Sequence, residues 1–230
     1  MSKQSTTLAF AAAFIIALTP FSSYATNIPG TSDPWLAGMP NGSTASMGDS
    51  APGQSPVLVT GLNLSSGGAI TFSVSGAVSN GPCCSLSGPD GGAIFFHLTG
   101  AENGISDIVA PINALIGVFL DASQPDGSPA PSALDFSILG TGFSSLAPGL
   151  KQTFFVGDGL TGTGSGNIQS FIVPTGATRL FLGTMDLFGW YNNLGSFDVT
   201  ATQVSEPNPL LLFALGLSFL GITRRYLPRM

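Results

Sequence analysis

The sequence predicts an all-β protein, an antiparallel β-sandwich of the jelly-roll type. Glycine and proline are abundant, with 31 and 17 of 230 residues, and both are unfavourable inside helices. The hydrophobic content of 43%, with 17 Phe, is enough to build a core. From residue 57 onward, short apolar stretches alternate with turn sequences such as PDGG and QPDGSP. This combination favours strands and turns over helices and over a disordered chain.

Two segments show the period-2 alternation of a half-buried strand. One has Ile70, Phe72, Val74, Gly76 and Val78 on one face, and the other has Phe197, Val199 and Ala201. Further strands are expected at 57–64, 93–98, 115–121, 153–157, 168–173 and 178–185. The only candidate helical turn lies at 105–115, where Pro111 would interrupt it.

Composition divides the chain into four parts. Residues 1–25 are expected to be a signal peptide, with a helical apolar region, and residues 26–56 a flexible lead-in rich in Gly, Pro and Ser. Residues 57–204 form the β-sandwich domain, and residues 205–230 a sorting or anchor segment with a short membrane helix.

Charge excludes one class of partner. Between residues 27 and 205 the chain has eleven acids and two bases, Lys151 and Arg179. A nucleic-acid backbone is bound through several Lys or Arg contacts, so no nucleic acid is expected. An acidic surface is compatible with cation binding, although solubility alone explains it equally well.

The N-terminus has the pattern of a Sec-type secretory signal. Lys3 precedes an apolar region at 8–18, and Ser23-Tyr24-Ala25 is a small-x-small cleavage site. Cleavage is expected after Ala25, and the alternative is an uncleaved N-terminal anchor.

The C-terminus combines Glu206-Pro207, an apolar run at 210–222, and then Arg224, Arg225 and Arg229. As a helix the apolar run would span about 20 Å, against a hydrocarbon core of about 30 Å. The basic residues after it are expected to stay cytoplasmic, with the body of the protein outside.

This tail resembles the PEP-CTERM sorting signal of exported Gram-negative bacterial proteins, in which Pro-Glu-Pro precedes a short apolar helix and an Arg-rich end. Glu206 and Pro207 match the motif, Arg224 and Arg225 match the basic end, and Ser205 stands in place of the first proline. The resemblance implies transient insertion into the inner membrane and processing by an exosortase-like transpeptidase. A plain short tail anchor is the alternative.

Enzyme chemistry has little support. The chain has a single histidine, His97, in an apolar stretch, and it lacks the GxSxG, HExxH and P-loop patterns. A glycoside hydrolase would require a pair of acids, and the candidates for such a pair are Asp158, Asp186 and Asp198. No catalytic residue is assigned.

Two further motifs have open interpretations. Cys83-Cys84 is an adjacent pair, which would form a strained vicinal bridge, pair with another chain or stay as thiols. The single GDGLTGTGSGN sequence at 157–167 is interpreted as a flexible loop.

The stretch TMDLFGWYNNLGSFDV at 184–199 is the best candidate for a site. Asp186, Asn192 and Asn193 offer one carboxylate and two amide oxygens, which are ligands that calcium prefers. The alternative is a plain hairpin, with the Asn-Asn pair and Gly195 in its positive-φ turn positions.

The run at 171–199 resembles the C-terminal part of small calcium-dependent galactose-binding lectins of bacteria, which are jelly rolls of the galactose-binding-domain-like class. Asp186, Asn192 and Asn193 match their calcium ligands, and Gly195-Ser196-Phe197-x-Val199 matches their exit strand. The resemblance also implies ligand carbonyls at Asn80 and at Trp190. Trp190 and Tyr191 are the aromatic residues that would stack on a sugar, and the alternative is that they belong to the rim or the core.

These observations together predict a non-enzymatic, exported protein of the cell surface, periplasm or biofilm matrix. The first hypothesis is a calcium-dependent, lectin-like module that binds an extracellular polysaccharide. The alternative is a purely structural surface protein without a ligand. A hydrolase with an Asp pair is a third hypothesis.

Overall fold

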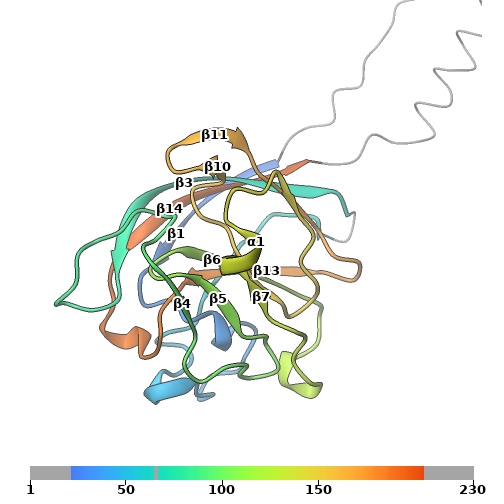
Figure 1. The fold of residues 1–230 in the computed structure, drawn as a ribbon. Coiled ribbons are helices and arrows are strands. Elements are labelled where there is room, and N and C mark those ends of the chain that lie inside the picture. Colours follow the sequence, from blue (N-terminus) through green and yellow to red (C-terminus); the bar gives the residue numbers. More distant parts are fainter. Residues whose placement is uncertain (1–21, 65–66, 205–230) are drawn as a thin grey trace, which may run out of the picture.

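The computed structural model describes residues 22–64 and 67–204, and it shows a mostly β protein with several sheets and one short helix (Figure 1). Each of the eight segments that the sequence predicts as a strand contains one. Residues 1–21 of the expected signal peptide at 1–25, and the whole sorting tail at 205–230, lie outside the described residues. None of the helices in the described part is both long and apolar enough for a membrane span.

The largest sheet has five strands. In spatial order they are β1 (Ser22–Pro29), β14 (Leu194–Val204), β3 (Ala69–Ser79), β12 (Ser170–Ile172) and β8 (Ser145–Leu146). Strand β14 pairs with β3 along its whole length and with β1 over eight residues. The predicted alternation in β14 is confirmed, because Phe197, Val199 and Ala201 are buried while Asp198 is exposed.

A four-stranded sheet packs against the five-stranded sheet (Figure 1). Its order is β2 (Val57–Leu58), β13 (Arg179–Thr184), β6 (Leu115–Leu120) and β9 (Thr153–Phe155). The two sheets meet through aromatic rings. The ring centroid of Phe154 in β9 lies 5.6 Å from that of Phe171 in β12, which in turn lies 5.1 Å from Phe72 in β3. The main core therefore lies between these two sheets.

Smaller elements surround this core. A three-stranded sheet contains β4 (Ile94–Phe96), β5 (Ile108–Pro111) and β7 (Leu134–Asp135), and a hairpin contains β10 (Leu160–Gly162) and β11 (Ser165–Ile168). The hairpin stands above the five-stranded sheet in Figure 1. The helical turns are η1 (Pro34–Leu36), η2 (Ser46–Gly48), η4 (Pro125–Gly127), η5 (Trp190–Asn192) and α1 (Phe136–Leu139).

Two details differ from the expected antiparallel topology. Strand β12 pairs with β8 in parallel, and β5 pairs with β7 in parallel. The segment at 105–115 is also not helical, because its apolar residues form strand β5. Ile108 and Ala110 are buried two residues apart, and Pro111 ends the strand instead of breaking a helix.

The prediction of a flexible lead-in at 26–56 is wrong in the structure. This segment contributes half of edge strand β1 and the turn η1, and it buries Ile28, Trp35 and Leu36 completely or almost so. Its Gly and Pro residues form turns over the molecule's own core. Asp33 caps η1 by accepting a hydrogen bond from the Trp35 N–H at 2.9 Å, and Pro34 supplies the first helical position.

The predicted cleavage position lies within β1. Ala25 pairs with Thr200 of β14, and the residues after it, Thr26 to Pro29, pair with 196–199. Four residues of the strand therefore precede the expected cleavage site and four follow it.

Both bases of the described chain bind backbone carbonyls. Lys151 Nζ donates to the carbonyl oxygens of Ser128 at 3.0 Å and of Pro129 at 2.8 Å. Arg179 Nε donates to the carbonyl oxygen of Asp121 at 2.7 Å. These bonds hold the loop that contains η4. In residues 22–64 and 67–204, no ion pair joins either base to a carboxylate.

Candidate functional site

The stretch around Asp186 connects the two main sheets and is not a hairpin. Strand β13 before it belongs to the four-stranded sheet, and β14 after it belongs to the five-stranded sheet. The left-handed positions are Gly189, with φ 76°, and Gly195, with φ 80°, so the turn does not place the asparagines there. The alternative of positive-φ positions is therefore wrong for Asn192 and Asn193 and is confirmed for Gly195.

Two buried oxygens in this connection lack a hydrogen-bond partner. Asp186 is 3% exposed, and its Oδ1 accepts the Leu187 N–H at 2.6 Å while its Oδ2 is unpaired. Asn193 is 6% exposed, and its Nδ2 donates to the Gly30 carbonyl at 3.2 Å while its Oδ1 is unpaired. A buried polar atom without a partner costs about 1–3 kcal/mol, so each such atom in a folded protein requires an explanation.

Asn192 faces the loop that follows β3. Its side chain is exposed, and a Cβ atom built on Gly81 would lie 3.7 Å from its Oδ1. Gly81 directly follows Asn80, which is half-buried. The structure therefore brings Asn192 of the 186–193 connection close to the Asn80 loop.

Asp49 fixes the shape of the connection, and no local sequence pattern indicates this role. Its Oδ2 accepts the Trp190 N–H at 2.7 Å, and its Oδ1 accepts the Tyr191 N–H at 2.9 Å. A carboxylate therefore caps the first amides of η5 from 141 residues away in the chain. The segment 26–56, which contains Asp49, also supplies Gly30. The Gly30 carbonyl accepts hydrogen bonds from Asn193 Nδ2 and, at 2.7 Å, from Thr184 Oγ1.

The acids around this connection repel one another. Burial raises the pKa of Asp186 to about 6, and the charge of Asp49 adds to the rise. The Leu187 N–H, which donates to the carboxylate, and the nearby polar groups of Asn193 and Phe188 oppose that rise.

Burial is also the main cause that raises the pKa of Asp33 well above its ordinary value, with Asp49, Glu102 and Asp186 contributing. The pKa of Asp49 is raised by burial and by Glu102. A cation near these groups would relieve the repulsion, and neither Lys151 nor Arg179 supplies one.

Trp190 belongs to the core and not to the surface. Its indole is fully buried and donates to the Thr184 carbonyl at 2.9 Å, and its own carbonyl accepts the Asn193 N–H at 3.1 Å. The interpretation of Trp190 as a sugar-stacking ring is therefore wrong. Its carbonyl retains one lone pair for an ion.

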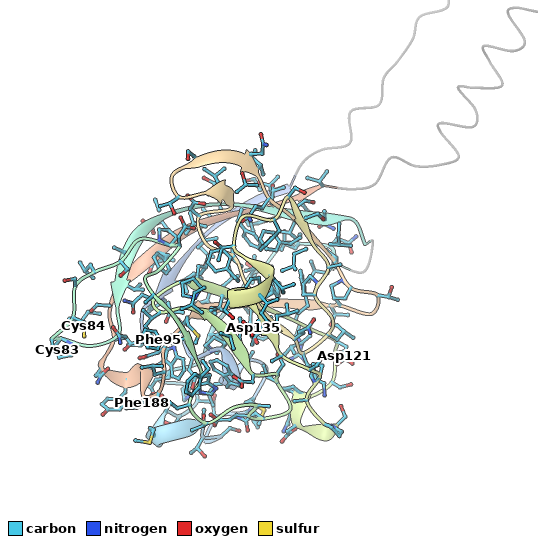
Figure 2. All side chains as sticks on the ribbon, in the orientation of Figure 1. Cys83, Cys84, Phe95, Asp121, Asp135 and Phe188 are labelled. Atoms are coloured by element: carbon cyan, nitrogen blue, oxygen red, sulfur yellow. The ribbon has the colours of Figure 1, made fainter. Side chains whose placement is uncertain are left out.

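Two other rings of the connection point outward. Tyr191 is 61% exposed, and Phe188 is 42% exposed. Figure 2 shows Phe188 on the same side of the molecule as Phe95, Cys83 and Cys84. These exposed rings replace Trp190 as the aromatic surface beside the candidate ion ligands.

His97 has a structural environment. It is buried, it stacks on Trp35 with a centroid distance of 3.6 Å, and its ring meets Trp190 edge-on. Its Nδ1 lies 2.8 Å from the Gly100 carbonyl, and its Nε2 lies 3.0 Å from Thr99 Oγ1. Burial lowers the pKa of His97, which favours the neutral imidazole.

The three acids considered for hydrolysis have separate surroundings. Asp158 accepts the backbone N–H groups of Leu160 and Gly164, and Asp198 accepts Asn27 Nδ2 on the exposed face of β14. Asp186 is buried within the β13–β14 connection.

Cys83 and Cys84 are exposed thiols with a sulfur-to-sulfur distance of 3.1 Å.

The residues assigned to sorting lie mostly outside the described chain. Glu206, Pro207, Arg224 and Arg225 fall in 205–230, and only Ala25 of the signal cleavage site is described.

Within residues 22–64 and 67–204, no three His, Cys, Asp or Glu side chains form a group suited to a metal ion. The oxygens around Asp186 are a different set, with one carboxylate and several amide or carbonyl oxygens.

Comparisons with protein-family models, with curated proteins and with solved structures found no match for this chain.

Proposed function

We propose that this chain is an exported cell-surface or matrix protein whose two facing sheets form a jelly roll of the galactose-binding-domain-like class. We further propose that its β13–β14 connection holds a calcium ion and binds carbohydrate. The observation that carries the ion site is the pair of buried, unpaired oxygens, Asp186 Oδ2 and Asn193 Oδ1. Calcium binds such carboxylate and amide oxygens.

Asn192 Oδ1 and the Asn80 carbonyl complete the proposed ligand set, because Asn192 is close to Gly81 and is exposed. The ion would supply positive charge to a group of acids that the described bases do not neutralise. A sugar would reach it from the side of Asn192, where Tyr191 and Phe188 expose their rings. Aromatic rings beside polar groups are common in sugar sites.

A structural role without a sugar is the second candidate. The burial of Asp186 and Asn193 favours it, because an ion held by these oxygens would be largely enclosed. In that case calcium would connect the lead-in, the Asn80 loop and the β13–β14 connection, and the surface would take no ligand.

Calcium is expected to raise the melting temperature of the purified protein relative to EDTA. Binding at 100 times the Kd stabilises the native state by about 2.7 kcal/mol, which corresponds to about 5–10 °C for a domain of this size. Differential scanning fluorimetry measures the shift.

Asp186→Ala and Asn193→Ala should abolish the calcium shift. Asp126→Ala, which removes an exposed acid in η4, should keep it. An unchanged melting temperature at millimolar calcium in the wild type would eliminate the ion site. A glycan array in calcium and in EDTA then separates the sugar-binding module from the purely structural protein.

The two ends of the chain carry a separate proposal about export and sorting. We expect Sec-type export, cleavage after Ala25, and removal of the tail near Glu206-Pro207 by an exosortase-type enzyme. Intact mass spectrometry of the protein from a Gram-negative host that has such an enzyme measures both cuts. Arg224→Ala with Arg225→Ala should leave the tail attached, and processing unaffected by this change would contradict the assignment.

A further inference from the structure

The outward face of the five-stranded sheet is a regular array of small polar side chains. The register aligns three rows across β14 and β3, which are Thr202–Thr71, Thr200–Ser73 and Asp198–Ser75, and Asn27 of β1, which follows the proposed cleavage site, extends the last row. Their neighbours along each strand point into the core. The array contains hydroxyl, amide and carboxylate groups, and it contains no aromatic or basic side chain.

One depression lies on this face, and two further depressions lie beside it at the β10–β11 hairpin. The first, of about 410 Å³, is lined by Asn27, Ser73, Ser75, Asp198 and Thr200 among others. The second, of about 310 Å³, shares Ser73 with the first and continues beneath the β10–β11 hairpin. The third, of about 270 Å³, shares Val74, Asp158 and Gly164 with the second. We call these three neighbouring depressions together the outer groove.

We propose that the outer groove binds a neutral polysaccharide chain without calcium. This inference goes beyond the ion site, because it concerns another face and other residues. Sugar hydroxyls both donate and accept hydrogen bonds, as do the serine and threonine hydroxyls of the floor. Leu160 and the exposed Ile168 of the hairpin form an apolar side of the groove for the C–H faces of the sugar rings.

One polar group in the groove is already positioned. Asn27 Nδ2 donates to Asp198 Oδ1 at 2.9 Å and to Ser196 Oγ at 3.0 Å, which holds the exposed carboxylate on β14 at one end of the array. A carboxylate is the strongest acceptor for a sugar hydroxyl, because charge-assisted hydrogen bonds are stronger than neutral ones. Asp198 is therefore the expected anchor.

The charges select the class of polymer. Asp90, Asp158 and Asp198 line the groove, and the lining contains no Lys or Arg, so anionic polymers are repelled. Asp90 accepts one backbone N–H group and Asp158 accepts two, so part of the acceptor capacity of these carboxylates is already used within the protein. This leaves a largely hydroxyl-lined surface with one exposed carboxylate, which suits a neutral chain better than a cationic one.

A protein partner fits this face less well. Protein interfaces have central clusters enriched in aromatic residues, Met and Arg, and the array has none of these. The face also contains β-branched and small residues in flat rows, which suit an extended chain that lies across the strands.

The test is affinity electrophoresis of the purified protein in EDTA through gels that contain neutral polysaccharides (galactomannan, xyloglucan, mixed-linkage β-glucan, dextran), anionic alginate or cationic chitosan. Retardation by at least one neutral polymer and not by alginate is expected. Asp198→Ala and Thr200→Val should each weaken that binding, Asp198→Ala by about tenfold or more.

Matched variants separate this site from the ion site. The exposed acid variant Asp126→Ala should bind the neutral polymer like the wild type, and the EDTA keeps calcium from the ion site. Circular dichroism checks that Asp198→Ala and Thr200→Val remain folded. Retardation by none of the neutral polymers, retardation by chitosan alone, or binding unchanged by both groove variants would overturn the proposal. None of these outcomes bears on the calcium shift, which is measured separately.

Discussion

Trp35→Ala is expected to destabilise the protein by about 3–5 kcal/mol, the range for removing a large aromatic side chain from a core. The indole is fully buried, stacks on His97, and lies 5.4 Å from Trp190 between ring centroids. Its Nε1 donates to the Ser106 carbonyl at 3.0 Å, and that acceptor would lose its partner. Urea unfolding followed by far-UV circular dichroism measures the change.

Two control variants make this result specific. Met47→Ala changes an exposed residue of the same segment and should shift the stability by less than about 0.5 kcal/mol. Trp35→Phe retains an aromatic ring but loses the bond to Ser106, so its cost should lie between the other two. If Trp35→Ala were as mild as Met47→Ala, residues 26–56 would be a lead-in and not part of the core.

The sequence predicts the long strands well and the lead-in poorly, for one physical reason. In β3 and β14 the buried and exposed residues alternate along the strand itself, so a local pattern is enough to recognise them. Strand β1 and η1 owe their burial to residues far along the chain. A composition rich in Gly, Pro and Ser is common to linkers and to turns that cover a core, and it does not distinguish them.

At the candidate site, too, the sequence predicts local features and misses contacts between distant residues. Asp186 and Asn193 are recognised from sequence because they lie seven residues apart in one connection. Asp49 is missed because its only role is to accept amides 141 residues away. Trp190 is misjudged because the direction of a ring depends on the turn, and the left-handed Gly189 directs it inward while Tyr191 points outward.

Asp186→Asn is expected to stabilise the calcium-free protein at pH 7 and above. The pKa of Asp186 is raised from 3.8 to about 6 in the folded state, so the native protein binds a proton more tightly than the unfolded chain. Stability from this group is therefore full below pH 4 and is lost as the pH rises from about 4 to 6. The loss is about 3 kcal/mol, and an asparagine avoids it because it does not titrate.

The measurement is urea unfolding of both proteins in EDTA at several pH values from 4 to 8. The stability difference should be small near pH 4 and should grow in favour of Asp186→Asn up to about pH 6.5. His97, Asp33 and Asp49 also titrate with shifted pKa values, but they are present in both proteins and largely cancel in the difference.

Calcium should reverse the order of the two proteins, because the ion favours the ionised carboxylate that burial disfavours. At saturating calcium and pH 7, the wild type should gain stability and Asp186→Asn should gain little. If Asp186→Asn is more stable than the wild type without calcium and does not respond to calcium, then Asp186 is an ion ligand. Its buried charge destabilises the protein when no ion is bound. If Asp186→Asn were less stable than the wild type in EDTA at pH 7, the carboxylate would instead be a structural acceptor whose charge the fold requires.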